Sequence, residues 1–483
     1  MATYNALYLQ LLSMFSTILD DDMSSKCAIV VGSGLAGLSA ASQLVKNNIP
    51  VRVLERSAKP GGNSIKASSG INGASTFYQP VLEPEDAFYS DTIQSVGERM
   101  LTFTAERQNL IKTLTEGSAD AIRWLVEERD VDLSKVAQLG GHSYARTHRG
   151  AGSPPGFAIV SALLKSLKES PFFHLQTSCT VTKVLLERKR AIGVEYLDAN
   201  GNYEELHGPV IFASGGFGGD AKGLLAQYRP DLAGYPSTND PQPGTQPLLT
   251  AAGAQLIDMD SVQVHPTGFV DPADPTSPLK FLAAELLRGE GGILLSNGKR
   301  FVNELDTRKK VANAITSTPS ASKTPRQWEV QIILDEATYD AAKSHVNFYI
   351  FKGLMRKMTL SELGPVALDA IKAYASTVAS HRDDPFGRTF FGNWALNDPT
   401  TESVIFVGTV TPVIHYTMGG VLINEKSEVL AKNGKRIDGV WAAGEITGGI
   451  HGGNRLGGSS LLECVVFGKI AGDQCAEFLS SGR

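Results

Sequence analysis

The sequence predicts an α/β fold in which a discontinuous, Rossmann-like dinucleotide-binding domain carries an inserted α+β capping domain. Two observations carry this prediction. A strand, a glycine-rich loop, a helix and a second strand follow one another over residues 28–55. The same kind of pattern, short apolar runs ending in glycine turns, returns after Thr409. Because the 483 residues exceed what one simple core accommodates, a pattern that stops and returns indicates one domain built from two stretches of chain.

The first stretch contains every part of a dinucleotide-binding fingerprint. The first strand is Ala28–Val31, and Gly32, Gly34 and Gly37 follow in GxGxxG spacing. The helix Leu35–Val45 overlaps the third glycine, and the second strand, Val51–Leu54, ends at the acid Glu55. The first glycine permits the tight turn, the second lets backbone approach a pyrophosphate, and the third lets the helix pack on the strand. The helix N-terminus offers N–H groups to the phosphates. Glu55 is placed to accept hydrogen bonds from a ribose.

A second glycine-rich loop follows this unit and narrows the choice of cofactor. Pro60-Gly61-Gly62-Asn63-Ser64 comes directly after the fingerprint, and Ile65–Gly73 is made mostly of small and polar residues. A loop of this kind suits a cofactor that is held extended and deep, and small residues let the backbone press against a flat ring. We therefore expect FAD.

The remaining elements are predicted from apolar periodicity and turn residues. Residues 84–127 are charge-rich and helical, and a Pro-, Asn-, Gln- and Gly-rich stretch, Asp231–Pro247, marks a boundary. The expected strands are Thr180–Leu186, Ala191–Leu197, Val210–Ala213, Gly291–Leu295 and Gln331–Leu334, and the further helices are Phe157–Leu167 and Ser460–Leu479. The predicted organisation is an extension over 1–23, an FAD-binding domain over 24–238 and 361–483, and a capping, substrate-binding domain over 239–360.

Composition excludes several classes of function. The chain is 42% apolar and 20% charged with a net charge of −5, which argues against a nucleic-acid-binding surface. Four cysteines without a CxxC pair fit a reducing compartment, so we expect a cytoplasmic protein, with a mitochondrial location as the alternative. No window reaches the ~18 consecutive apolar residues of a spanning helix, and no membrane insertion is expected. The first 22 residues fit either a dispensable or packed helix or a targeting signal.

Several polar residues accompany the glycine turns and are candidates for the chemistry. They are His265, Glu285, Arg288, Arg308, His415 and Arg455. Arginine forks match carboxylate geometry bidentately, so four donors from this set, His265, His415, Arg308 and Arg455, suit a small dianion. Taken singly, each arginine is more simply a structural ion pair and each histidine a satisfied loop residue.

Some other residues are predicted to belong to the core, and the role of two polar segments stays undecided. Trp124 is expected in the core, and Cys27 and Cys179 are expected to be buried small hydrophobes. The polar segments Gly140–Ser143 and Arg146–Arg149 fit two roles equally well: lining the flavin pocket, or forming a solvated connection.

From about Lys26 to the C-terminus, the chain resembles the soluble, FAD-containing fumarate reductases of fungal type, within the fumarate reductase/succinate dehydrogenase flavoprotein superfamily. The stretches that carry the resemblance are GGNSIKASSGING, AQLGGHSYARTH, IDMDSVQVHPTGF, LLRGEGGILL, GKRFVNEL, HYTMGG, AAGEITGG and HGGNRLGGSSLLECVVFG. The resemblance implies a soluble flavoprotein that reduces fumarate, a small dicarboxylate, to succinate.

The resemblance also implies roles for individual residues. His265, His415, Arg455 and Gly458 would hold the substrate carboxylates, while flavin N5 delivers a hydride to one carbon. Arg308 would give a proton to the other carbon, with Glu285 and Arg288 relaying that proton from solvent. The clamp would stabilise the negative charge that develops on the substrate. Arg308 as a donor departs from the rule that arginine stays protonated, and a neighbouring carboxylate such as Glu285 would return the proton.

By the same resemblance, FAD would contact residues from both stretches of the FAD-binding domain. Beyond the fingerprint glycines they are Ala36, Glu55, Asn63, Ser64, Ser69, Gly70, Ile71, Val181, Tyr416, Glu445, Ser460 and Leu461. Relatives that attach FAD covalently use a histidine where this chain has Ile65, so FAD is expected to be non-covalent. The chain has neither a haem CxxCH motif nor a cysteine set for an iron–sulfur cluster. We therefore expect no metal, and we expect reduced free flavin or a reductase as the electron donor.

Two departures from the family pattern keep other functions open. The family's Thr-Gly-Asp-Gly motif is absent from the loop Asp240–Pro247, and Lys309 stands where the family has an acid after the catalytic arginine. The leading hypothesis is fumarate reduction. The first alternative is a flavin-dependent reductase or dehydrogenase acting on another activated C=C bond, and the second is a flavoprotein without turnover.

Overall fold

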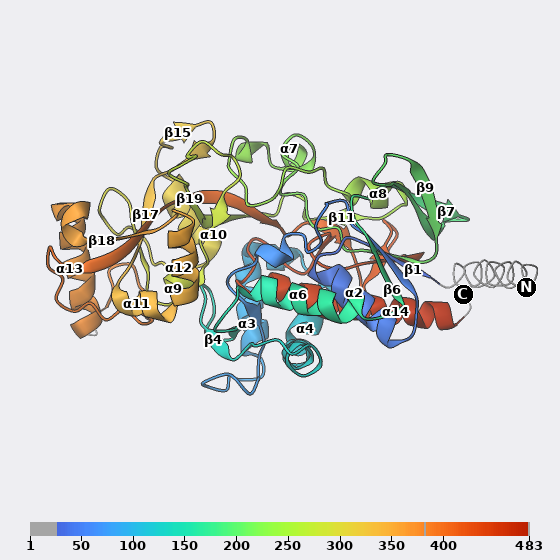
Figure 1. The fold of residues 1–483 in the computed structure, drawn as a ribbon, viewed down its shortest axis with the longest axis horizontal. Coiled ribbons are helices and arrows are strands. Elements are labelled where there is room, and N and C mark those ends of the chain that lie inside the picture. Colours follow the sequence, from blue (N-terminus) through green and yellow to red (C-terminus); the bar gives the residue numbers. More distant parts are fainter. Residues whose placement is uncertain (1–26, 381–382, 482–483) are drawn as a thin grey trace, which may run out of the picture.

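The structure is a computed structural model that describes residues 27–380 and 383–481. The extension predicted over residues 1–23 lies outside the described residues. Two units share the chain (Figure 1). Residues 27–257 and 418–481 form what we call the Rossmann unit, and residues 262–417 form the capping unit, each around its own six-stranded sheet. This is the predicted α/β architecture of a discontinuous Rossmann-like domain with a capping insertion.

A mostly parallel sheet forms the centre of the Rossmann unit, with strand order β21-β22-β10-β1-β2-β6. Only β21 runs antiparallel to its neighbour. The strands are β1 (Ala28–Val31), β2 (Val51–Leu54), β6 (Phe173–Gln176), β10 (Val210–Phe212), β21 (Glu428–Leu430) and β22 (Arg436–Ala442). β1 is buried at every position, as a central parallel strand covered on both faces must be. β22 comes from the C-terminal stretch and pairs with β10, so the return of the chain completes this sheet.

Three helices pack together beside this sheet: α2 (Leu35–Lys46), α6 (Pro155–Lys168) and α14 (Ser459–Ser480). α14 lies against α2, where Gly468 and Gly472 of α14 come close to the backbone of Ala36 and Ala40 (Figure 1). The predicted strands 28–31 and 51–54 are confirmed residue for residue. The predicted helices over 35–45, 157–167 and 460–479 are confirmed with ends that differ by one or two residues.

The turn between β1 and α2 depends on two glycines of the fingerprint. Gly32 has φ +103°, and a Cβ there would lie 2.5 Å from the carbonyl oxygen of Ala213. A Cβ on Gly37 would lie 2.0 Å from the carbonyl oxygen of Gly32. Neither position has room for a side chain. Gly32 permits the tight turn beside Ala213, and Gly37 permits the close approach of α2 to β1.

Smaller elements complete the Rossmann unit. An antiparallel hairpin and a third strand form one sheet, as predicted for residues 180–197, and two further three-stranded sheets lie elsewhere. The strands are β7 (Thr180–Glu187), β8 (Arg190–Leu197), β9 (Tyr203–His207), β3 (Ile71–Asn72), β4 (Lys135–Ala137), β5 (Thr147–Arg149), β11 (Leu256–Ile257), β20 (Gly420–Leu422) and β23 (Thr447–Gly448). The helices are α3 (Ala87–Val96), α4 (Ala105–Glu116), α5 (Ser118–Arg123), α7 (Leu224–Tyr228) and α8 (Gln246–Ala251).

The capping unit is built on an antiparallel sheet of order β13-β12-β19-β17-β14, with β18 also paired to β19. Its strands are β12 (Val262–Phe269), β13 (Phe281–Leu282), β14 (Ile293–Leu295), β17 (Val330–Leu334), β18 (Arg356–Thr359) and β19 (Val404–Thr417), with a separate two-stranded ribbon of β15 (Ser322–Lys323) and β16 (Arg326–Gln327). Its helices are α9 (Leu286–Gly289), α10 (Arg308–Thr316), α11 (Glu336–Ala341), α12 (Lys343–Phe351) and α13 (Pro365–Ser380). β19 runs from this unit back towards the Rossmann unit (Figure 1).

The division into domains remains a proposal. The packing of α8 and α13 favours a capping domain that begins and ends later in the chain than the sequence suggested. α8 packs with the hairpin strand β7 of the Rossmann unit. Ile371 and Tyr374 of α13 belong to one buried cluster with Ile293 and Ile405 of the capping sheet. We therefore propose that the capping part runs from about residue 262 to 417 rather than from 239 to 360.

The burial of Trp124 and of two cysteines matches the predictions, and the structure also shows where the two polar segments lie. Trp124 is 3% exposed within the main core, and Cys27 and Cys179 are buried, as predicted. All four cysteines are free thiols. Neither polar segment, Gly140–Ser143 or Arg146–Arg149, lines the main cavity. Arg146–Arg149 is buried throughout, whereas Ser143 at the end of the first segment is exposed. Arg146 is fully buried and forms ion pairs with Glu83 and Asp91. Within the described residues, none of the helices is both long and apolar enough to cross a bilayer.

Candidate active site

One cavity of about 430 Å³ runs between the two units. At one end it is lined by the glycine turn after β1, including Gly32 and Gly34, and at the other by Arg308, His415 and Arg455. The fingerprint and the predicted dianion clamp, which lie far apart in the sequence, therefore belong to the same cavity.

The Rossmann end of this cavity has the features of a dinucleotide site. α2 begins at Leu35, and the preceding Gly34 has no side chain to cap it. The Leu35 amide donates to the Ser64 hydroxyl at 3.1 Å, and the helix N-terminus faces the cavity as in sites that bind phosphate. Glu55 accepts hydrogen bonds from the Ser33 amide at 2.9 Å and the Ser57 amide at 2.8 Å, and it still borders the cavity.

The fit of FAD to this end is supported by glycines in the cavity wall. Gly34, Gly62 and Gly215 line the cavity, and a Cβ on Gly215 would meet no protein atom within 4 Å. Bare backbone at these positions leaves room for a cofactor to approach closely. Most predicted FAD contacts line the cavity: Gly32, Gly34, Ala36, Glu55, Asn63, Ser64, Ser69, Gly70, Val181, Tyr416, Glu445, Ser460 and Leu461. Gly37 and Ile71 do not line it, and Gly37 instead sets how closely α2 packs.

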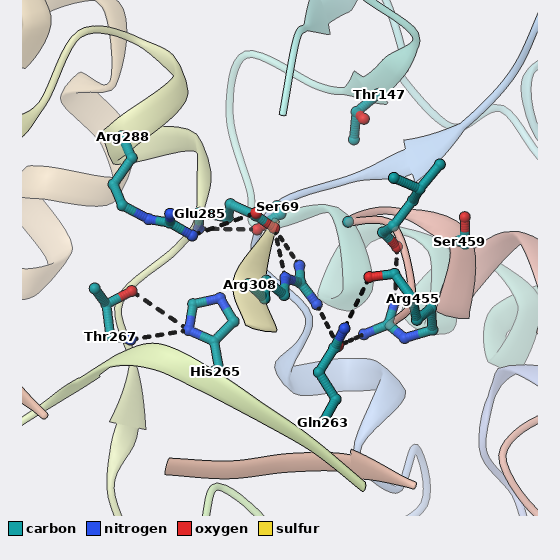
Figure 2. A network of polar contacts seen from close by, with 12 residues as sticks. Ser69, Thr147, Gln263, His265, Thr267, Glu285, Arg288, Arg308, Arg455 and Ser459 are labelled. Carbon is teal, nitrogen blue, oxygen red and sulfur yellow. Dashed lines mark hydrogen bonds and ion pairs between the residues drawn. The ribbon is translucent and has the colours of Figure 1, made fainter. Parts of the chain in front are cut away.

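The capping unit contributes Arg308, which is the first residue of α10. Thr307 precedes it and caps the helix by accepting from the Lys310 amide, which fixes where the helix and hence Arg308 begin. Arg308 donates from Nε to Glu285 Oε2 at 2.7 Å, and its NH2 contacts the same oxygen (Figure 2). Arg288 reaches the other oxygen of Glu285 at 3.3 Å. The predicted arginine–glutamate–arginine series is thus contiguous, with Glu285 and Arg288 buried behind the cavity wall.

Glu285 is ionised in this arrangement. Burial alone would raise the pKa of Glu285, but the guanidinium groups of Arg308 and Arg288 outweigh burial and hold the pKa below its ordinary value. A carboxylate that keeps its charge beside Arg308 is suited to accept a proton only transiently and to return it.

Sequence reasoning missed Gln263, which connects the two arginines of the clamp. Gln263 is buried on β12, and its Oε1 accepts from Arg308 NH1 at 2.9 Å and from Arg455 NH2 at 3.1 Å. Its amide donates to the Arg455 carbonyl at 2.8 Å (Figure 2). Gln263 is two residues before His265 on the same strand, so both side chains lie on the same face of the sheet. This spacing could have identified Gln263 as a site residue from the sequence.

Replacing Gln263 with leucine is expected to lower kcat/KM for the substrate by about 10- to 100-fold, because hydrogen bonds to charged groups contribute about 1.5–3 kcal/mol. The side chain keeps its approximate volume while both guanidinium groups lose their shared acceptor. Gln263→Glu is the comparison variant: it keeps the acceptor but adds a negative charge between the arginines, so it is expected to raise KM by competing with an anionic substrate. Steady-state kinetics with FAD content measured for each variant check both. Unchanged kinetics in Gln263→Leu would refute the bridging role.

His265 and His415 lie side by side, with ring centroids 5.3 Å apart. Nδ1 of His265 accepts from the Thr267 amide at 3.2 Å, so in the neutral ring the proton is on Nε2. That Nε2 is buried and has no hydrogen-bond partner among the described residues. His415 lines the cavity, and its Nδ1 lies 3.1 Å from the Thr238 hydroxyl. His265 does not line the cavity; its ring meets that of His415 edge-on and keeps an unpartnered Nε2.

Both rings are neutral. Burial, reinforced by the positive charges of Arg308 and Arg455, holds the pKa values of His265 and His415 well below 6.5. The clamp therefore carries its positive charge on arginine and uses the histidines as neutral donors.

Buried neutral histidines predict acid sensitivity of folding. Burial lowers the pKa of five histidines: His142 to about 3, His148 and His345 to about 4, and His265 and His415 well below 6.5. Each is protonated in the unfolded chain below pH 6.5 but stays neutral when folded, so the free energy of unfolding falls as pH drops from about 6.5 towards 4. Glu445, whose pKa burial raises to about 7, acts in the opposite direction over the same range.

We expect a lower urea midpoint for the holoprotein at pH 5 than at pH 7. The side chain of His345→Gln does not titrate. In this variant, the decrease in the free energy of unfolding between pH 7 and pH 5 should be smaller by up to about 1.4 kcal/mol per pH unit. An equal loss in the wild type and in His345→Gln would contradict this assignment.

The structure shows where the two departures from the family pattern lie, the loop of residues 240–247 and Lys309. The loop of residues 240–247 borders the cavity, and Asp240 forms an ion pair with Lys66 across its rim. Arg56 also donates to the Pro243 carbonyl at 2.7 Å. Lys309 and Lys310 are exposed, and Lys310 lies 3.1 Å from Asp306, so neither lysine shares the Arg308–Glu285 ion pair.

Comparison with known proteins agrees with this geometry. Residues 28–461 match the model of the FAD binding domain family. The chain is 46% identical to fumarate reductase 1 of Saccharomyces cerevisiae over 94% of this chain and 99% of the relative. It is 40% identical to a fumarate reductase of Schizosaccharomyces pombe, over 92% of this chain and 88% of the relative. Among solved structures, the open conformation of a flavocytochrome c3 fumarate reductase aligns with TM-score 0.73 and 31% identity, covering 94% of this chain and 78% of that one.

Proposed function

The chain belongs to the FAD binding domain family and, within it, to the fumarate reductase flavoproteins, and from this membership we propose that it uses FAD to reduce fumarate to succinate. The observation that carries the proposal is the composition of the cavity. The glycine turn of the fingerprint, two arginines and a neutral histidine donor, His415, line one cavity. A fumarate dianion matches that charge, and a neutral or cationic substrate does not.

The binding step would use donors at the cationic end of the cavity. Arg455 and His415 line the cavity, and His265 supplies an unpartnered Nε2. These donors and Gly458 would hold the two carboxylates and draw electron density from the double bond, which stabilises the negative charge that develops on a carboxylate during reduction.

FAD, when bound, supplies the reducing equivalent as a hydride from N5. The protein's part is then to add a proton to the neighbouring carbon, which completes the two-electron, two-proton conversion of fumarate to succinate. We propose that Arg308 gives this proton and that Glu285, which accepts two hydrogen bonds from Arg308, returns one to it. Arg288, held by Glu285 and by the Glu304 carbonyl at 2.6 Å, would orient Glu285 and pass protons from solvent.

We propose that FAD is held without a covalent bond, because Ile65 offers no nucleophilic atom where covalent relatives have histidine. Reduced free flavin or a reductase is the proposed electron donor. A cytoplasmic location, with a mitochondrial one as the alternative, is supported by the four free thiols.

A panel of unsaturated acids tests the choice of substrate. Purified holoprotein, reduced anaerobically, is mixed with fumarate, maleate, mesaconate, acrylate and cinnamate, and the rate of flavin reoxidation is followed. The proposal expects fumarate to be fastest. The altered loop of residues 240–247 at the cavity rim motivates the second candidate, another activated alkene, and a faster reaction with a different acid would favour it. No reoxidation by any of these acids would favour a flavoprotein without turnover.

A further inference from the structure

Arg455 is a buried cation without an acidic partner. It is 1% exposed, and its guanidinium donates to the Leu456 carbonyl at 3.1 Å and to Gln263 Oε1 at 3.1 Å. Within residues 27–380 and 383–481, no carboxylate forms an ion pair with it, in contrast to Arg308, which pairs with Glu285. Glu445 and Glu463 stabilise the Arg455 charge only from beyond ion-pair distance. Because the hydrogen-bond acceptors of this buried charge are neutral, it needs a further contact at its guanidinium.

The ring of Tyr416 provides that stabilisation. The central guanidinium carbon of Arg455 lies 4.1 Å from the centroid of the Tyr416 ring, within the range of a cation–π contact. Tyr416 is near the end of β19, is 5% exposed and borders the same cavity as Arg455. Cation–π contacts are strongest where both partners are desolvated, as they are here.

A second buried cluster fixes the orientation of this ring. The Tyr416 hydroxyl donates to Glu463 Oε2 at 2.6 Å. Burial raises the pKa of Tyr416 well above 10, so the hydroxyl remains a donor. Glu463, on α14, is also contacted by His451 Nε2 at 3.0 Å and by the Thr447 hydroxyl at 3.2 Å. The His451 ring meets the Tyr416 ring edge-on, with centroids 6.1 Å apart, so the tyrosine is held at its hydroxyl and at its side.

We propose that Tyr416 is a positioning residue: its ring face holds the Arg455 guanidinium in the cavity, ready for one carboxylate of a dicarboxylate substrate, and Glu463 fixes the ring. This inference rests on the proposed function. It gives the Tyr416 side chain a role beyond the FAD contact expected from sequence.

The use of a ring in place of an acid has a chemical consequence. A carboxylate beside Arg455 would neutralise the guanidinium and compete with an anionic substrate for its N–H groups. The face of an aromatic ring stabilises the charge without accepting the in-plane hydrogen bonds, so these stay available for a carboxylate. The clamp thus keeps one arginine paired for proton transfer, Arg308, and one unpaired for binding, Arg455.

Binding of succinate to the oxidised holoprotein tests this role without turnover. The change in flavin absorbance on titration with succinate gives Kd. Tyr416→Leu removes the ring and is expected to raise Kd by about tenfold, the order expected for a desolvated cation–π contact. Tyr416→Phe keeps the ring face and is expected to stay within about threefold of the wild type. Glu463→Gln keeps an acceptor for the Tyr416 hydroxyl, so it is expected to stay within the same threefold as Tyr416→Phe. For each variant, kcat at saturating fumarate should change much less than KM.

The results separate the possible roles. Equal Kd values in the wild type and Tyr416→Leu would overturn the proposal, and so would a Tyr416→Phe as weak as Tyr416→Leu, because the hydroxyl rather than the ring would then matter. FAD content is measured for each protein, and Tyr416→Met, which retains more volume, replaces the leucine variant if that variant loses FAD. Failure of the wild type itself to bind succinate would instead contradict the proposed function and remove the basis of this role.

Discussion

Replacing Arg308 with alanine is expected to lower the rate of fumarate reduction by at least about 10³-fold while FAD remains bound, a loss within the range for removing a general acid. Arg308 is the one cavity-lining arginine paired to a buried carboxylate in the described structure, and that ion pair is what would restore its proton. Its removal takes away the donor at the carbon and also one of the two charges that keep Glu285 ionised. Steady-state turnover with a reduced donor and fumarate measures the effect.

The control for Arg308→Ala is Lys310→Ala on the same helix turn. Lys310 is exposed and its ion pair with Asp306 is on the surface, so its loss should leave turnover within about twofold of the wild type, as is usual for surface pairs. Arg308→Lys separates charge from geometry: lysine keeps the charge but lacks the fork that binds both Glu285 and Gln263. If Arg308→Ala retained a substantial fraction of wild-type turnover, the proposed proton donor would be wrong.

Replacing Gly37 with alanine is expected to abolish FAD binding in most of the purified protein and to destabilise the remainder by about 1–3 kcal/mol, the usual cost of forcing extra volume into a packed core. A methyl group there would lie 2.0 Å from the Gly32 carbonyl oxygen, which is backbone and cannot turn aside. α2 must then move off β1, and its N-terminus leaves the position from which it faces the cofactor. FAD released into the supernatant after denaturation, per mole of protein, measures the effect.

Gly152→Ala is the matched control for Gly37→Ala. A Cβ at Gly152 meets nothing within 4 Å, and the residue does not have a left-handed backbone conformation. It should retain one FAD and the wild-type unfolding midpoint. Full FAD occupancy in Gly37→Ala would show that the close approach of helix and strand is not needed for binding.

Local sequence signals predicted the Rossmann unit well, because its elements are specified by short-range patterns. The strand, glycine turn and helix of residues 28–46 follow from apolar runs and from the spacing of Gly32, Gly34 and Gly37. The end of the capping unit was harder to place, because β19 is one long strand that serves the capping sheet and then continues to the cavity at His415 and Tyr416. Periodicity does not tell which sheet a strand joins.

Residue types alone did not reveal the connections within the site. The six candidates His265, Glu285, Arg288, Arg308, His415 and Arg455 lie close together, but the residue that joins the two clamp arginines is a glutamine, a type that carries no catalytic signature. Likewise the segments Gly140–Ser143 and Arg146–Arg149 were expected either to line the pocket or to be solvated. In the second segment Arg146 instead forms a buried ionic cluster with Glu83 and Asp91, which depends on contacts distant in sequence.

The most direct test of the proposed chemistry is a single turnover. The holoprotein is reduced anaerobically with a stoichiometric amount of dithionite, one equivalent of fumarate is added, and flavin absorbance and succinate are measured together. The proposal predicts that the oxidised flavin spectrum returns and that one succinate forms for each FAD, in the wild type and not in Arg308→Ala. A wild-type flavin that stays reduced in the presence of fumarate, or reoxidises without forming succinate, would contradict it.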